Sequence, residues 1–197
     1  MKIRYAWTAL AAACLWAGGA SAEIRNVTDP QAPRSLTSDG PVQVSWADPA
    51  TFSELRQSRN RWEAERGDWV QDLAAYLQKQ AAKQLQPGQR LDIKLTDIKR
   101  AGDYEPWHGP NWNDVRVMRD LYPPRISLDF TLYGADGQVL AQGQPKLMDP
   151  SYLYNSSVGL STDPLRYEKR MLDDWLRPPV PQGQRGRRTL RQHARRR

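Results

Sequence analysis

Cysteine is nearly absent from this chain of 197 residues, and histidine is scarce. The single cysteine is Cys14, and the two histidines are His108 and His193. Because Cys14 stands in an N-terminal run that we expect to be removed, the mature chain would hold no thiol. This excludes disulfides, a thiol nucleophile and a thiolate metal site. A packed core must therefore stabilise the fold.

Long apolar runs are also missing after the first 22 residues, so no later segment is expected to cross a membrane. Lys2 and Arg4 precede the apolar run "AWTALAAACLWAGG", and "ASA" at residues 20–22 follows it. This pattern is typical of a bacterial secretory signal peptide. We expect residues 1–22 to be removed and the protein to reach the periplasm or to be secreted. Lipidation at Cys14 is an alternative, but it would leave a very short apolar run.

Positive charge is concentrated at the C-terminus. Of 29 basic residues, two lie in the leader and seven are arginines in residues 182–197, where no acid occurs. Residues 23–181 therefore hold 20 basic and 22 acidic residues and are nearly neutral. We expect residues 182–197 to be a disordered basic tail that makes weak contact with anionic surfaces, or one without a specific role. No nucleic-acid partner is expected.

The remaining chain predicts a flexible lead-in at residues 23–40 and a single α+β domain at residues 41–181. Alternating apolar residues predict strands near residues 42–46, 91–95 and 126–132, and "GADG" predicts a hairpin into residues 138–143. Helical spacing predicts helices over residues 69–85 and 164–176, the second anchored in the core by Trp175. This order predicts a mainly antiparallel sheet of about four strands with two helices packed on one face.

Four segments carry a resemblance: "VSWADPATFSELR", "PGQRLDIKLTDIKRAGDYEPW", "DVRVMRDLYPPRISLDFTLYGADGQVLAQGQPKLMD" and "STDPLRYEKRMLDDWLR". They resemble a known bacterial family, the domain of unknown function 3016. The resemblance covers about residues 42–177, and it implies a secreted protein of the Gram-negative envelope. It implies no activity, and the basic tail lies outside it.

Residues 101–126 concentrate side chains that bind or react. The stretch "AGDYEPWHGPNWNDVRVMRDLYPPRI" holds two tryptophans, one histidine, three arginines, four carboxylates and four prolines. Tryptophan and arginine supply much of the binding energy at protein interfaces, so the 101–125 loop is the candidate binding surface of a non-catalytic interaction domain. Its partner could be a glycan, a peptide or an envelope protein. The candidate binding residues are Trp107, His108, Trp112, Arg116, Arg119 and Arg125.

Two alternatives remain for this loop. It could be purely structural, with prolines that stiffen its path and arginines that pair with its own carboxylates. It could also belong to a small envelope hydrolase that uses His108 with the loop carboxylates of Asp103, Glu105, Asp114 and Asp120. Ser156 and Ser157 are candidate nucleophiles, but they do not stand in a G-x-S-x-G motif.

No cofactor or metal is expected from the motifs. The chain has no G-x-G-x-x-G or Walker lysine motif for a nucleotide and no D-x-D-x-D-G loop for calcium. Zinc sites typically use more than one histidine or cysteine, and the domain holds only His108. We expect the loop to be ordered by its own residues and to leave Trp107 or Trp112 partly exposed, because the helices already supply the sheet with apolar side chains.

Overall fold

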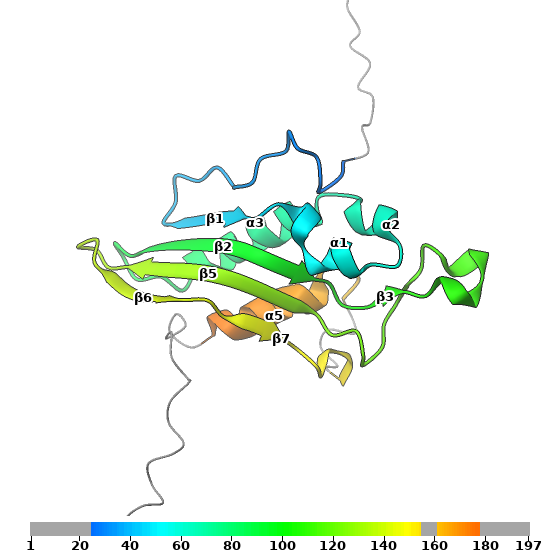
Figure 1. The fold of residues 1–197 in the computed structure, drawn as a ribbon. Coiled ribbons are helices and arrows are strands. Elements are labelled where there is room, and N and C mark those ends of the chain that lie inside the picture. Colours follow the sequence, from blue (N-terminus) through cyan, green and yellow to red (C-terminus); the bar gives the residue numbers. More distant parts are fainter. Residues whose placement is uncertain (1–24, 155–160, 178–197) are drawn as a thin grey trace, which may run out of the picture.

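The computed structural model describes residues 25–154 and 161–177 (Figure 1). These residues form a mixed α+β fold with four α-helices, a five-stranded sheet and a separate two-stranded hairpin. The helices are α1 (Ser53–Gln57), α2 (Arg61–Glu65), α3 (Trp69–Ala82) and α5 (Arg166–Leu176). The strands are β1 (Val42–Trp46), β2 (Arg90–Lys99), β3 (Asp103–Tyr104), β4 (Arg116–Val117), β5 (Arg125–Tyr133), β6 (Val139–Gly143) and β7 (Lys146–Met148).

The main sheet has the order β1-β2-β5-β6, and β7 pairs with the first part of β5. The β1–β2 pair is parallel, because α3 carries the chain back to the starting end of the sheet before β2 begins. All other pairs in this sheet are antiparallel. The α+β class and the mainly antiparallel sheet agree with the sequence-based expectation. The expected count of four strands and two helices is too low, because β7, α1 and α2 are too short to produce a clear periodic pattern.

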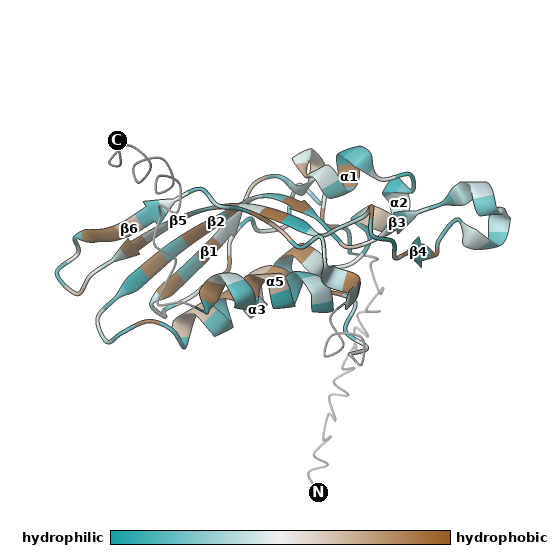
Figure 2. Cartoon of the chain, turned by 90° about the horizontal axis from the view of Figure 1, so that it is seen from below, coloured by the Kyte–Doolittle hydropathy of each residue, from teal (hydrophilic) through white to brown (hydrophobic). Residues whose placement is uncertain are grey.

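The core lies between one face of the sheet and the helices α3 and α5 (Figure 2). Alternate residues of β1, β2 and β5 are buried on this face, and the helices place their apolar stripes against them. The strand contribution consists of Val42, Val44, Trp46, Leu91, Ile93, Leu95, Ile98, Ile126, Leu128, Phe130 and Leu132. The helix contribution includes Trp69, Val70, Leu73, Leu77, Ala81, Met171, Leu172 and Leu176.

Trp175 lies at the rim of this core. Its side chain is only partly buried, and its ring meets Phe130 edge-on with 5.7 Å between ring centroids. The residue expected to anchor α5 is therefore a peripheral contact, and the fully buried Leu172 and Leu176 hold the helix. A hydrogen bond of 2.7 Å from the Tyr76 hydroxyl to Asp173 further joins α3 to α5.

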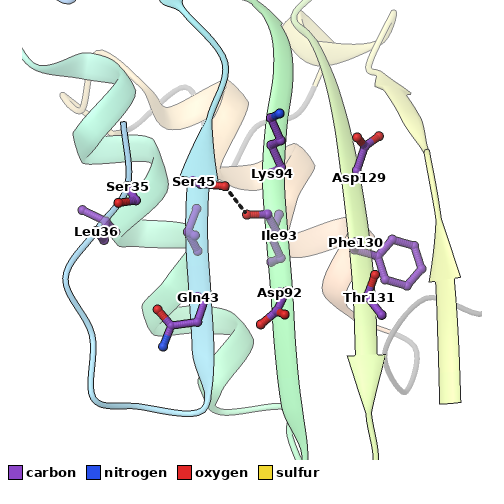
Figure 3. Close-up of a pocket in the computed structure, with 11 residues that line it drawn as sticks. Ser35, Leu36, Gln43, Ser45, Asp92, Ile93, Lys94, Asp129, Phe130 and Thr131 are labelled. Atoms are coloured by element: carbon purple, nitrogen blue, oxygen red, sulfur yellow. Dashed lines mark hydrogen bonds between the residues drawn. The ribbon is translucent and has the colours of Figure 1, made fainter. Parts of the chain in front are cut away.

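The opposite face of the sheet is polar. Gln43, Asp92 and Thr131 form one row across β1, β2 and β5, and Ser45, Lys94 and Asp129 form the next row. These side chains line a shallow groove of about 400 Å³ (Figure 3). The groove follows from period-2 alternation, since the residues between the buried positions must point to the uncovered face.

The described part of the lead-in lies along this domain. Val27 is buried, and its N–H donates to the carbonyl of Glu65. Further along, the Leu36 N–H donates to Val44 and the Trp46 N–H donates to Arg34, so the segment borders the free edge of β1. The expected leader and the basic tail lie outside the described residues. Within the described ranges, no helix combines the length and apolarity needed to span a bilayer.

We predict that Leu172→Ala destabilises the domain by about 2–5 kcal/mol, because it removes a fully buried side chain and leaves a cavity. Asp174→Ala on the same helix is the matched control. It removes only exposed ion pairs with Arg170 and Arg177, so its effect should stay within about 1 kcal/mol. Urea unfolding followed by circular dichroism measures both. Equal midpoints for the two variants would show that α5 is not docked through Leu172.

Candidate functional site

A buried carboxylate organises the end of the sheet from which β3 leaves. Glu54 of α1 has no solvent exposure. Its Oε2 accepts from the Lys99 ammonium at 3.3 Å and from the Arg100 N–H at 3.0 Å, and its Oε1 accepts from the Arg100 Nε at 3.1 Å. Arg116 of β4 donates to the same Oε1. One carboxylate therefore joins α1, the end of β2 and the hairpin strand β4.

These cations outweigh the cost of burying Glu54. Burial by itself raises the pKa of this carboxyl, but the charges of Arg116, Arg100 and Lys99 lower it to about 2. The two guanidinium groups also stack on aromatic rings: Arg100 lies 4.6 Å from the Trp69 ring centroid, and Arg116 lies 4.8 Å from that of Tyr104. Such contacts stabilise arginine where water is excluded.

The hairpin β3–β4 is attached to the domain through this network. Gly102, at the start, has a φ of 76°, and a Cβ there would lie 2.7 Å from the Met118 sulfur and 2.8 Å from the Val117 carbonyl oxygen. Only glycine fits this close approach of the two arms. Arg116 donates from one arm to the carbonyls of Ala101 and Gly102 in the other, at 3.2 and 3.1 Å.

Two further buried carboxylates hold the rest of the hairpin. Asp103 accepts from Arg59 at 2.9 Å and lies 3.8 Å from the Lys99 ammonium. Glu105 accepts from Arg119 at 2.7 Å, from His108 at 2.8 Å and from the Tyr122 hydroxyl at 2.9 Å. Burial raises the pKa of Glu105, but the hydrogen bonds from Tyr122, His108 and Arg119 leave it below its usual value.

Beyond these anchors, residues 106–115 form a tip that projects from the end of the sheet (Figures 1 and 2). Two 3-10 turns, Pro106–His108 and Pro110–Trp112, build it. Trp107 and Trp112 are 59% and 45% exposed, and both rings lie near the His108 ring, with centroid distances of 6.0 and 5.5 Å. The Asn60 side chain braces the tip by a 2.8 Å bond to the Asn113 carbonyl.

The structure brings together only part of the predicted site. Trp107, His108 and Trp112 share the tip, and Arg119 joins them through Glu105. Arg116 lies inside the Glu54 network. Arg125 begins β5 and donates to Gln57 of α1, away from the tip.

Two residues that complete the site lie outside the dense stretch. Arg59 pairs with Asp103 and covers the Trp107 ring at 5.1 Å, and Glu54 holds three cations. A local signal exists for Glu54, because it stands between the apolar residues Phe52 and Leu55, where an unpaired carboxylate would be costly. Arg59 stands in a polar segment that offers no such signal.

The carboxylates proposed for hydrolysis do not act as one group. Glu105 contacts His108, whereas Asp103 is bound by Arg59 and Lys99. Asp114 and Asp120 are exposed, and Asp120 accepts a hydrogen bond from the Tyr154 hydroxyl. Within the described residues, His108 contacts Glu105, Arg119 and the two tryptophan rings, so no serine, threonine or cysteine stands beside it for activation. Ser156 and Ser157 lie outside the described residues. In the described part of the chain, no group of three or more His, Cys, Asp or Glu side chains could hold a metal ion.

We predict that Glu54→Gln costs about 3–5 kcal/mol, because it leaves three cations without their shared anion. The folded pKa of about 2 lies below the ordinary value of 4.5, so this stabilisation is present above pH 4.5 and is lost as pH falls toward 2. The difference in unfolding free energy between wild type and variant should therefore shrink over that interval. A constant difference from neutral pH to pH 2 would contradict the assignment.

A second buried carboxyl is predicted to behave in the opposite way. Glu168 accepts from the Ala101 N–H at 2.6 Å, but its Oε2 has no hydrogen-bond partner, and burial raises its pKa. Its raised pKa favours folding at low pH, and this benefit is lost as pH rises through the folded pKa.

Glu168→Gln keeps the acceptor without the charge. It should raise stability at neutral pH by about 1 kcal/mol, the scale of one poorly satisfied buried group, and by less near pH 4. Thermal unfolding across pH measures this, with Asp174→Asn on the same helix as control. A loss of stability at neutral pH would show that Glu168 is needed as an anion.

Comparison with known proteins adds one match. A family model described as "Protein of unknown function (DUF3016)" matches residues 40–178. No curated protein and no solved structure matches the chain. The matched span contains the whole sheet, the hairpin and all the carboxylates of the network.

Proposed function

Because the chain belongs to the family described as protein of unknown function (DUF3016), we propose its function from its geometry: a non-catalytic interaction domain that binds its partner through the tip of residues 106–115. The single observation that carries this proposal is the pair of exposed tryptophans, Trp107 and Trp112, on a projecting hairpin with a buried anchor. The periplasm, or the outside of the cell, is the proposed location, and the leader pattern at residues 1–22 supports it.

The exposure of Trp107 and Trp112 is not explained by a lack of room for tryptophan in the core. Trp46 and Trp69 are buried, so the fold has an interior that accepts indole rings. Trp107 and Trp112 stand instead at the most projecting part of the domain, where each leaves apolar area in water. Burying such area in a complex is favourable at roughly 25 cal/mol per Å², and tryptophan is among the side chains that dominate binding energies.

The tip is also held in shape before any partner binds. Pro106 and Pro110 restrict the backbone of the two turns, and three donors fix Glu105 at the base. Arg59 covers Trp107 from the side of the domain. A surface that is ordered in advance loses less conformational entropy on binding, which suits recognition.

The tip offers two kinds of contact. The indole rings present apolar faces, and Arg59 and Arg119 are each nearly half exposed beside them. A peptide, a protein surface and a glycan can all use rings together with forked guanidinium donors.

We predict that Trp107→Ala combined with Trp112→Ala abolishes partner capture from envelope extracts and changes stability by less than about 2 kcal/mol, because about half of the surface of each residue is already in solvent. Val139→Ala with Leu140→Ala is the matched control, since these β6 side chains are 52% and 55% exposed and lie away from the tip. Capture is measured by pull-down with the purified chain, and folding by circular dichroism.

Two outcomes would count against the binding tip. Unchanged capture by the tryptophan variant would place the binding surface elsewhere. Global unfolding of that variant would make the tip a structural element, which is the alternative that the proline-rich sequence also allows.

A further inference from the structure

The main sheet has two edges, and the described chain covers only one of them. At β1, residues 34–36 of the lead-in form an antiparallel bridge and two main-chain hydrogen bonds with residues 44–46. At the other edge, β6 and β7 both pair with β5, and no strand among the described residues pairs with their outer side. A free strand edge can pair with another polypeptide, so this edge is a candidate contact surface.

The phase of the hydrogen bonds shows which main-chain groups of β6 point outward. The Leu128 N–H donates to the Pro145 carbonyl at 3.2 Å, and two residues further along β5, Phe130 lies opposite Gly143. Hydrogen-bonded and non-hydrogen-bonded pairs alternate along an antiparallel ladder. Gly143 therefore turns its N–H and C=O toward β5, whereas Gln142 turns its N–H and C=O away from the sheet.

The side chains of this edge lack the charges that usually protect a free strand. The segment "GQVLAQGQP" at residues 137–145 holds no charged residue, and Val139 and Leu140 are 52% and 55% exposed. Figure 2 shows this apolar part of β6 at the outer side of the sheet. Proteins commonly place lysine or another charge on an exposed edge strand, because it prevents pairing with other chains. The uncharged edge of β6 is suited to pairing instead.

The pattern of charges around β6 fits a second copy of the same strand. In an antiparallel pair with a two-fold axis at Gln142, this residue faces itself, and Ala141 of one copy faces Gly143 of the other. The uncharged segment then faces itself, so no like charges meet within it. Lys146 of one copy comes next to the turn between β5 and β6 of the other, whose only charged residue is Asp136. Neither Lys146 nor Asp136 has an ion-pair partner among the residues that the structure describes.

We propose that two copies of this chain pair edge to edge through β6, in antiparallel orientation. The two sheets join into one, and the helices of both copies lie on the same face of it. Because the lead-in covers the β1 edge, the pairing closes as a two-fold dimer and does not continue into a filament. β6 pairs with the half of β5 that is remote from the tip, so both tips stay free. This inference goes beyond the proposed function and does not depend on it.

Sedimentation equilibrium of the chain from Glu23 onward, with its C-terminal segment kept, tests the dimer. We expect the mass to rise with concentration from that of one chain to that of two. Gln142→Lys and Gln142→Glu should each weaken self-association about tenfold, because the new charge faces its own like at about 5 Å across the two-fold axis. An equal mixture of the two variants should restore association, because opposite charges then face each other.

Two controls accompany these variants. Gln71→Lys and Gln71→Glu make the same charge changes at an exposed position of α3 and should leave the dimer unchanged. Amide hydrogen exchange of the unmodified chain, followed by NMR, is a second readout that needs no variant. The Gln142 N–H should exchange more slowly as concentration rises, whereas the Gly143 N–H, which is bonded to β5, should be protected at every concentration.

Three results would overturn the dimer proposal. An unmodified chain that keeps the mass of one copy at every concentration would show that β6 does not pair with itself. A dimer that neither charge at position 142 weakens would assign the contact to another surface. Two weakened variants whose mixture fails to associate would exclude the antiparallel pairing about Gln142. None of these results bears on partner capture by the tip, which the tryptophan variants test separately.

Discussion

One buried carboxylate is the constraint on which this structure depends. Glu54 is fully enclosed and bound by three cations, from the end of β2 and from β4. Taking these charges out of water is costly, and the cost is offset only when every partner is in place with good geometry. The network therefore accepts one arrangement of α1, the end of β2 and the hairpin. An apolar cluster of equal volume would tolerate sliding that this arrangement does not.

The projecting tip is a consequence of that anchor. A two-stranded hairpin with only two residues in each strand has too few ladder bonds to hold its own shape. Asp103 and Glu105 replace the missing bonds with ion pairs to Arg59 and Arg119 at its base. Because the base is rigid, two tryptophans can stay ordered in solvent instead of collapsing onto the domain.

The two faces of the sheet have different roles: one is buried in the core, and the other is polar and open. One face and the helices α3 and α5 supply the apolar burial that stabilises a chain without cysteine in its described part. The other face is left polar, and its groove of amide, hydroxyl and charged side chains is open (Figure 3). The reactive and aromatic residues are concentrated at one end of the sheet, on a loop that the rigid elements support, which is where binding residues commonly lie.

The sequence by itself determined the α+β class, the main strands, the two long helices and the buried stripes, because periodicity is a local property that each segment carries alone. It also located the tip, since rings, prolines and arginines are adjacent in the chain. Only the tertiary structure decided the parallel β1–β2 pair, the fifth strand and the partners of the loop carboxylates. Glu54 pairs with Lys99, and Arg59 pairs with Asp103, although more than 40 residues separate the partners in the sequence. No local sequence pattern predicts such a pair. Long-range electrostatic partners are set by how the elements pack, so this part of the site could be read only from the fold.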